Sequence, residues 1–160
     1  EAMDKFIAGE CDIVTTDGSA LVGRRAVNDA LNDWSIFPTS PISKEPLGPV
    51  YRSNDSKWGD VINWVVYATI IADEYGVTSA NVDSVDTDAL PELGRLFGAN
   101  DGELQSVMGL DKKAFYNVIK QIGNYDEIYS RNLNPVGLFR EGGANDRWTN
   151  GGLIYAPPAR

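Results

Sequence analysis

A short apolar segment that ends on an acidic side chain, with a helical pattern directly behind it, constrains this chain more than any other feature. Residues 9–19 have the sequence GECDIVTTDGS, in which Cys11–Thr15 has the composition of a strand and Asp17 follows it. In an open α/β sheet, ligands bind outside the carboxyl ends of the strands. A carboxylate at that place can accept a charge-assisted hydrogen bond from an ammonium group. The segment therefore predicts an α/β fold, with Asp17 as a candidate ligand-binding residue.

Charge and residue types exclude several classes of function. The 14 Lys and Arg stand against 23 Asp and Glu, and the net charge of −9 disfavours binding to nucleic acid and anionic lipid. The chain has no His, which removes the usual activation of Ser and Cys nucleophiles and the commonest metal ligand. The uncharged apolar run 61–72 is shorter than the roughly 20 residues of a membrane span. We expect no nucleic acid partner, no direct membrane insertion, no metal and no cofactor.

Glycine and proline divide the chain into short elements, and the pattern becomes helix-rich after residue 55. Before that point we expect a helix over 1–8, the strand over 11–15, a helix over 19–32, a strand over 34–38 and an extended segment over 47–52. After it we expect one long helix from a cap at Asp55 or Ser56 to a stop at Gly76, and shorter helices over 88–97, 102–108, 112–122 and 125–133. The glycine-rich tail from residue 141 is predicted to be a loop with a brief extended piece over 153–155.

The single cysteine and the four tryptophans are interpreted as packing residues. Cys11 cannot form an internal disulfide, and a buried free thiol is the simpler interpretation, with pairing to a Cys outside this chain as the alternative. Trp34, Trp58 and Trp64 lie in apolar patterns and are expected in the core. Trp148 is the one tryptophan whose neighbours suggest a surface, although packing remains the preferred interpretation.

Several motifs in sequence order carry a resemblance to a known family. Residues 9–17 fit the pattern Gly-x-x-Asp-x-x-x-x-Asp, and further matching stretches are ISKEPLGP at 42–49, GVTSANVD at 76–83, IKQIGNY at 119–125 and GGLIYAPP at 151–158. Together they resemble the periplasmic solute-binding proteins that deliver polar amino acids to ABC transporters, and specifically the C-terminal half. One difference is that Gly18 stands where this branch usually has Arg or Gln, so the side-chain contacts of that position are not carried over.

The resemblance implies a fold and a division into lobes. The fold would be the C-terminal portion of a two-lobed, type II periplasmic-binding-protein-like fold. Residues 1–43 would form the C-terminal part of lobe 2. Residues 44–160 would form the return crossing and the C-terminal part of lobe 1, with a helical extension.

The resemblance also implies a non-enzymatic function in the periplasm. The protein would be the substrate-binding component of an amino-acid ABC transporter, with an L-amino acid as ligand and a membrane permease as partner. Asp17 would receive the α-ammonium group of the ligand. The Arg that holds the α-carboxylate in this family belongs to the N-terminal half and has no counterpart here, so we expect the chain by itself to bind amino acids weakly or not at all.

Other interpretations of the same residues stay open. Asp17 is also a good helix N-cap, and both roles are compatible if Ser19 caps the helix while Asp17 points into the cleft. The helical region from Asp88 onward would suit an independent carbohydrate-binding or protein-interaction module. A hydrolase acting through carboxylates alone would use Asp12 and Asp17, which alternation in a strand places on opposite faces. The acidic cluster at 83–88 lacks the Gly and the closing Glu of a calcium loop, and is interpreted as a solvated turn and helix cap.

Overall fold

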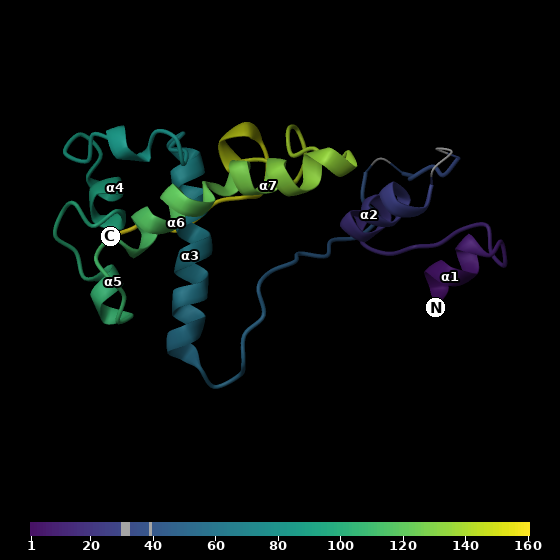
Figure 1. Cartoon of the computed structure of the whole chain (residues 1–160), viewed down its shortest axis with the longest axis horizontal. Coiled ribbons are helices and arrows are strands. Elements are labelled where there is room, and N and C mark those ends of the chain that lie inside the picture. The colour runs from purple at the N-terminus through teal and green to yellow at the C-terminus, as the bar shows by residue number, and fades with distance from the viewer. Residues whose placement is uncertain (30–32, 39) are drawn as a thin grey trace. The chain divides into compact units, whose positions relative to one another are not determined.

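The structure is a computed structural model that describes residues 1–29, 33–38 and 40–160. The chain divides into two compact units, each with its own set of helices (Figure 1). Unit 1 consists of Glu1–Gly48 with Leu133–Leu138, and unit 2 consists of Pro49–Asn132 with Phe139–Arg160. The predicted division into lobe segments 1–43 and 44–160 stays a prediction.

The described residues of unit 1 form two α-helices and a single 3₁₀ turn. These are α1 (Ala2–Ile7), α2 (Gly18–Asn28) and η2 (Asn134–Val136), and η2 packs against α2. The ring of Phe6 meets Trp34 edge to face, with the ring centroids 4.9 Å apart. The helix expected over 19–32 is present, but Asp29 follows its end, and residues 30–32 lie outside the described residues.

The two strands expected in unit 1 are not formed among the residues that the structure describes, so the strands of the predicted α/β, type II fold stay a prediction. Residues 11–15 and 34–38 carry no strand assignment, and the described ranges contain a single isolated bridge, between Arg147 and Ile154. A strand exists only when a neighbouring segment accepts and donates its ladder hydrogen bonds. No described segment pairs with residues 11–15, so this stretch does not form a strand although its composition is typical of one.

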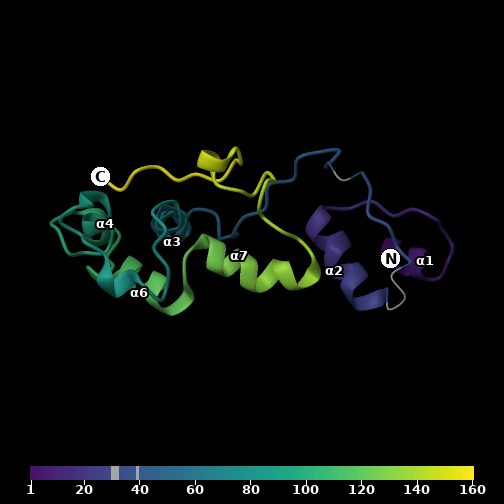
Figure 2. The ribbon, with the colours of Figure 1, turned by 90° about the horizontal axis from the view of Figure 1, so that it is seen from above.

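Unit 2 is helical, as the pattern after residue 55 predicted. Its elements are α3 (Ser56–Glu74), η1 (Val82–Ser84), α4 (Pro91–Leu96), α5 (Leu104–Val107), α6 (Ala114–Ile122), α7 (Tyr125–Leu133) and η3 (Trp148–Asn150). Figure 2 shows α3 end on, with α6 and α7 on one side and the C-terminal segment on the other. The long helix α3 is therefore the element around which unit 2 is arranged.

Local signals explain where α3 begins and ends. The Asp55 side chain accepts a hydrogen bond from the amide of Trp58 at 3.1 Å, which satisfies one of the free N–H groups at the helix start. At the other end Gly76 takes a φ of 66°, a conformation that side chains rarely adopt. By contrast, α4 begins at Pro91 and not at residue 88, because proline at the first helical position disfavours helix for the residue before it.

The core of unit 2 gathers on the second half of α3 and the helices that follow. The buried apolar cluster consists of Ala68, Ile71, Ala72, Val77, Val82, Leu93, Leu96, Phe97, Phe115, Ile119 and Ala159. Trp64 packs against this core as predicted, but the prediction for Trp58 is wrong, since it lies on the first turn of α3 and is 53% exposed. The prediction of a buried thiol is also wrong, because Cys11 is exposed. Within the described ranges, none of the helices combines the length and the apolar character that a bilayer crossing demands.

Candidate functional site

Asp17 lies at the start of α2 and is its N-cap. Its φ of −61° and ψ of 148° are extended, and the helix begins at Gly18. The side chain accepts a hydrogen bond from the amide of Ala20 at 3.3 Å. The alternative in which Ser19 caps the helix is therefore wrong, because Ser19 lies within the first turn and Asp17 makes the capping contact.

Two hydroxyl groups complete the hydrogen bonding of the Asp17 carboxylate. The Ser19 hydroxyl donates to Oδ2 at 2.8 Å, and the Thr16 hydroxyl donates to Oδ1 at 3.0 Å. Each carboxylate oxygen can accept about two hydrogen bonds. Oδ2 is filled by Ser19 and Ala20, whereas Oδ1 has accepted one. The carboxylate thus keeps room for one further donor, at Oδ1.

The surroundings of Asp17 favour its ionised form. The hydrogen bond from the Ser19 hydroxyl, followed by that from Thr16, lowers the pKa of the Asp17 carboxyl below its ordinary value. The N-terminus of α2 adds a partial positive charge. A carboxylate that is negative at neutral pH and has a free acceptor position on Oδ1 is suited to meet a cationic donor.

The other acidic residues singled out from the sequence do not join Asp17. Asp12 is exposed, and among the described residues its side chain takes part in no hydrogen bond or ion pair found in the structure. Asp83 binds Lys120 at 2.7 Å and receives a short hydrogen bond from Tyr116, and Asp86 accepts from the amides that follow it. In the part of the chain that the structure describes, no three His, Cys, Asp or Glu side chains come together as a metal site.

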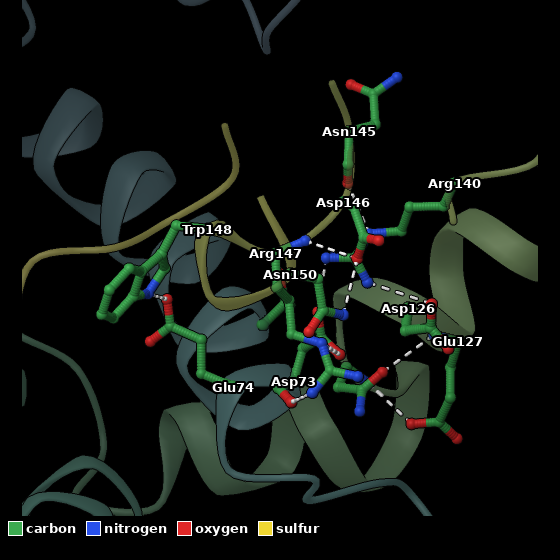
Figure 3. A network of polar contacts seen from close by, with 12 residues as sticks. Asp73, Glu74, Asp126, Glu127, Arg140, Asn145, Asp146, Arg147, Trp148 and Asn150 are labelled. Atoms are coloured by element: carbon green, nitrogen blue, oxygen red, sulfur yellow. Dashed lines mark hydrogen bonds and ion pairs between the residues drawn. The ribbon is translucent and has the colours of Figure 1, made fainter. Parts of the chain in front are cut away.

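A polar network in unit 2 was missed by sequence reasoning (Figure 3). Asp73, at the buried end of α3, pairs with Arg140, with 2.6 Å between Oδ2 and a guanidinium nitrogen. Both side chains are buried, with exposed fractions of 4% for Arg140 and 3% for Asp73. Arg140 also reaches Asp126 at 3.1 Å, and Arg147 approaches Asp73 at 3.6 Å. The network holds the segment after residue 139 against α3 and α7.

The electrostatics of this network indicate a structural role. Burial disfavours the charged guanidinium of Arg140, but the hydrogen bond and charge of Asp73, helped by Asp126, raise its pKa above the ordinary value. The guanidinium also lies 4.9 Å from the centre of the Tyr125 ring. A permanently charged Arg that is closed in by acidic and aromatic groups cannot exchange protons with a ligand. The signal in the sequence was an Asp directly after the uncharged run 61–72, and this pattern does not identify the partner of that Asp.

Comparison with known proteins identifies relatives along nearly the whole chain. No protein-family model matches it. The glutamate/glutamine/aspartate/asparagine-binding protein BztA of Rhodobacter capsulatus is 44% identical over 164 aligned residues, which span 100% of this chain and 47% of that protein. The general L-amino acid-binding periplasmic protein AapJ of Rhizobium johnstonii is 41% identical over 97% of this chain and 46% of its own length. The chain thus spans about half the length of the curated relatives it matches.

A solved structure agrees with these relatives. It is described as an ABC transporter/periplasmic binding protein from Brucella ovis with glutathione bound, and it matches with a TM-score of 0.89 and 40% identity. The match covers 98% of this chain and 49% of that one. The predicted resemblance is thereby confirmed, and the coverage is consistent with the expected C-terminal half. The chain is a homologue, over nearly all of its own length and about half of theirs, of amino-acid ABC transporter-binding proteins.

Proposed function

We propose that this chain supplies one half of the ligand site of a periplasmic amino-acid-binding protein that serves an ABC transporter. In this proposal the Oδ1 oxygen of Asp17 accepts a hydrogen bond from the α-ammonium group of an L-amino acid. An Arg outside this sequence pairs with the α-carboxylate, and a membrane permease receives the ligand. The whole protein is a two-lobed binding protein of type II, and it catalyses no reaction.

The observation that carries the proposal is the state of the Asp17 carboxylate. It is held by Thr16, Ser19 and the Ala20 amide, all within three residues, so its position does not depend on distant packing. Its pKa is lowered by the Ser19 and Thr16 hydroxyls, so it is negative at neutral pH. The remaining acceptor position on Oδ1 faces no donor among the described residues. An ammonium group, with three donors and a positive charge, complements that position.

The ligands in the names of the relatives share the chemistry that this carboxylate would recognise. Glutamate, glutamine, aspartate and asparagine are named for one relative, L-amino acids in general for another, and glutathione for the solved structure. The γ-linked glutamyl residue of glutathione keeps its free α-ammonium and α-carboxylate. A site that holds those two groups between one anion and one cation would accept all of these ligands and leave the side chain to the rest of the cleft.

The matches also bear on the alternative of an independent interaction module. They span 97–100% of the chain and so include α4 to α7. The helices of unit 2 are thus matched within the same relatives as the Asp17 segment. This favours the transport interpretation over a separate carbohydrate-binding or protein-interaction module.

The test is a calorimetric titration of the two-lobed protein that carries this chain, with L-glutamate, L-glutamine and glutathione as ligands. Asp17→Asn should weaken binding about a hundredfold or more, because it leaves a desolvated ammonium without its charged partner. Asp12→Asn is the matched control, since this exposed Asp lies in the same extended segment, and it should leave the affinity unchanged.

A second ligand separates the role of Asp17 from the function of the protein. N-acetyl-L-glutamate lacks the ammonium group, so it should bind the unsubstituted protein weakly and should respond little to Asp17→Asn. If Asp17→Asn keeps the affinity for L-glutamate, the assignment of Asp17 is refuted while the transport function stands. If the unsubstituted protein binds none of the three ligands, the proposed function itself is refuted.

A further inference from the structure

An open pocket in unit 2, separate from the Asp17 segment, combines aromatic and acidic walls. Glu74 and Tyr75 at the end of α3, Glu92 on α4, and Trp148 and Tyr155 from the C-terminal segment line it. Its volume is about 380 Å³, which is within the range of small-molecule sites. The C-terminal segment passes along α3 on the side opposite α6 and α7 (Figure 2), and its residues Trp148 and Tyr155 complete the lining of the pocket.

Hydrogen bonds tie the aromatic side chains to the two carboxylates. The indole N–H of Trp148 donates to Glu74 at 3.0 Å, and Figure 3 shows the indole nitrogen directed at that carboxylate. The Tyr75 hydroxyl donates to Glu92 at 2.8 Å, and the amide of Ala159 donates to its other oxygen at 2.7 Å. These contacts fix the orientation of the carboxylates and of the rings beside them.

Neither carboxylate has a cationic partner among the described residues. The six ion pairs found there include neither Glu74 nor Glu92. Two cations of this region are used elsewhere, since Arg95 donates to the carbonyl of Ala159 and Arg147 donates to the carbonyl of Asp73 near the end of α3. Two carboxylates therefore share one pocket without a counter-charge.

The electrostatic state of Glu74 agrees with this excess of negative charge. Burial raises the pKa of its carboxyl, and the charges of Glu92 and Asp73 add to the rise, while the Trp148 hydrogen bond opposes it. A group whose charged form is disfavoured in this way gains most when a cation enters the pocket.

We infer that this pocket binds a guanidinium group. A guanidinium is planar and weakly hydrated, stacks on aromatic faces and bonds to carboxylates through several N–H groups at once. The exposed faces of Trp148 and Tyr155, 58% and 67% exposed, offer the stacking surface, and Glu74 and Glu92 offer the acceptors. The guanidinium can belong to a free arginine-like solute or to an Arg side chain of a partner protein, since both present the same group.

The test follows the indole N–H signal of Trp148 by ¹⁵N NMR of the 160-residue chain, assigned with a Trp148→Phe variant. The probe is N-acetyl-L-argininamide, which has no free α-ammonium or α-carboxylate group. Titration with this probe should produce a saturable shift of the Trp148 indole signal. Glu74→Gln and Glu92→Gln should each weaken binding about tenfold, because each removes one charge and keeps a hydrogen-bond acceptor. The control Glu103→Gln, at an exposed position near α5, should leave it unchanged.

Further probes distinguish a free solute from a partner protein as the source of the guanidinium group. Another probe tests for non-specific binding. Equal binding of L-arginine and of the blocked probe supports recognition of the side chain of a free solute. Tighter binding of an Arg-containing peptide supports a partner protein. The inference is overturned if N-acetyl-L-norleucinamide shifts the signal equally, if neither Glu variant weakens binding while its amide spectrum stays folded, or if no probe gives a saturable shift.

Discussion

The two units of this chain differ in how they are held together. Unit 2 has a contiguous apolar core on α3, α4 and α6 and a buried ion network, whereas Val22 is the one buried apolar residue described in unit 1. Unit 1 instead exposes large apolar side chains such as Ile13 at 70%, Phe37 at 72% and Ile42 at 80%. The candidate ligand residue Asp17 thus lies in the unit with the smaller core, where local hydrogen bonds do the positioning. A side chain can thus be held in place by its immediate neighbours without a surrounding core.

The largest expected effect compares one phenylalanine from each unit. Phe115 is fully buried in unit 2, and Phe115→Ala should lower the free energy of unfolding by about 3–5 kcal/mol through lost burial and a cavity. Phe37→Ala in unit 1 should change it by about 0.5 kcal/mol or less, because that ring is already exposed. Urea unfolding followed by circular dichroism measures both. Equal losses would show that unit 1 has a core comparable to that of unit 2.

Breaking the buried ion pair should lower the free energy of unfolding by a similar or slightly smaller amount. Arg140→Met leaves the carboxylate of Asp73 buried without its partner, which should cost about 3–5 kcal/mol. The double variant Asp73→Leu/Arg140→Met removes both charges and should recover most of that loss. Arg147→Met is the control, since its side chain is 34% exposed and 3.6 Å from Asp73, and it should cost below about 1 kcal/mol. A double variant as unstable as Arg140→Met would contradict a pairwise role.

The smallest effect concerns Glu127, a carboxylate in unit 2 that, like Asp17, accepts several hydrogen bonds but takes two of them from a residue distant in sequence. Glu127 accepts hydrogen bonds from the amide and hydroxyl of Ser79, at 2.9 and 2.6 Å, and from the amide of Asn124 at 2.9 Å. Burial acts to raise the pKa of Glu127, but these hydrogen bonds outweigh it and the pKa is lowered. Glu127→Gln should cost about 1–2 kcal/mol at pH 7, since it removes the charge from these contacts.

The pH dependence of that variant checks the assignment. A lowered pKa in the folded state means that the contribution of Glu127 is complete above the unfolded value of about 4.3 and is lost as the pH falls through the lower folded value. The difference in unfolding free energy between the unsubstituted chain and Glu127→Gln should therefore shrink from pH 7 to pH 3. Glu141→Gln, at an exposed position, should show little difference at either pH. A difference that is constant with pH would rule out the charge as its source.

Local chemistry was enough to predict most of the helices. The caps at Asp55 and Asp17 and the turn at Gly76 lie close to the ends that the sequence suggested, and α7 spans the predicted residues. The start of α4 was misplaced because Pro91 outweighs the acidic residues before it. The predicted strands are not formed among the described residues because strand formation depends on a partner segment, which composition does not reveal. The sequence predicted Asp17 as a helix N-cap, and the structure confirms it, whereas the variant in which Ser19 caps the helix was wrong.

Local sequence was sufficient to predict the helical character after residue 55, the carboxylate at the start of α2 and the resemblance to amino-acid-binding proteins of ABC transporters. Each of these depends on residues that are neighbours in the chain. Folding was needed to bring Asp73 to Arg140, to place Ser79 where it donates hydrogen bonds to Glu127, and to bring Trp148 to Glu74 beside a second carboxylate. Those contacts join residues far apart in sequence. They form only when the chain folds back on α3, and no local pattern of residues specifies which distant side chain arrives there.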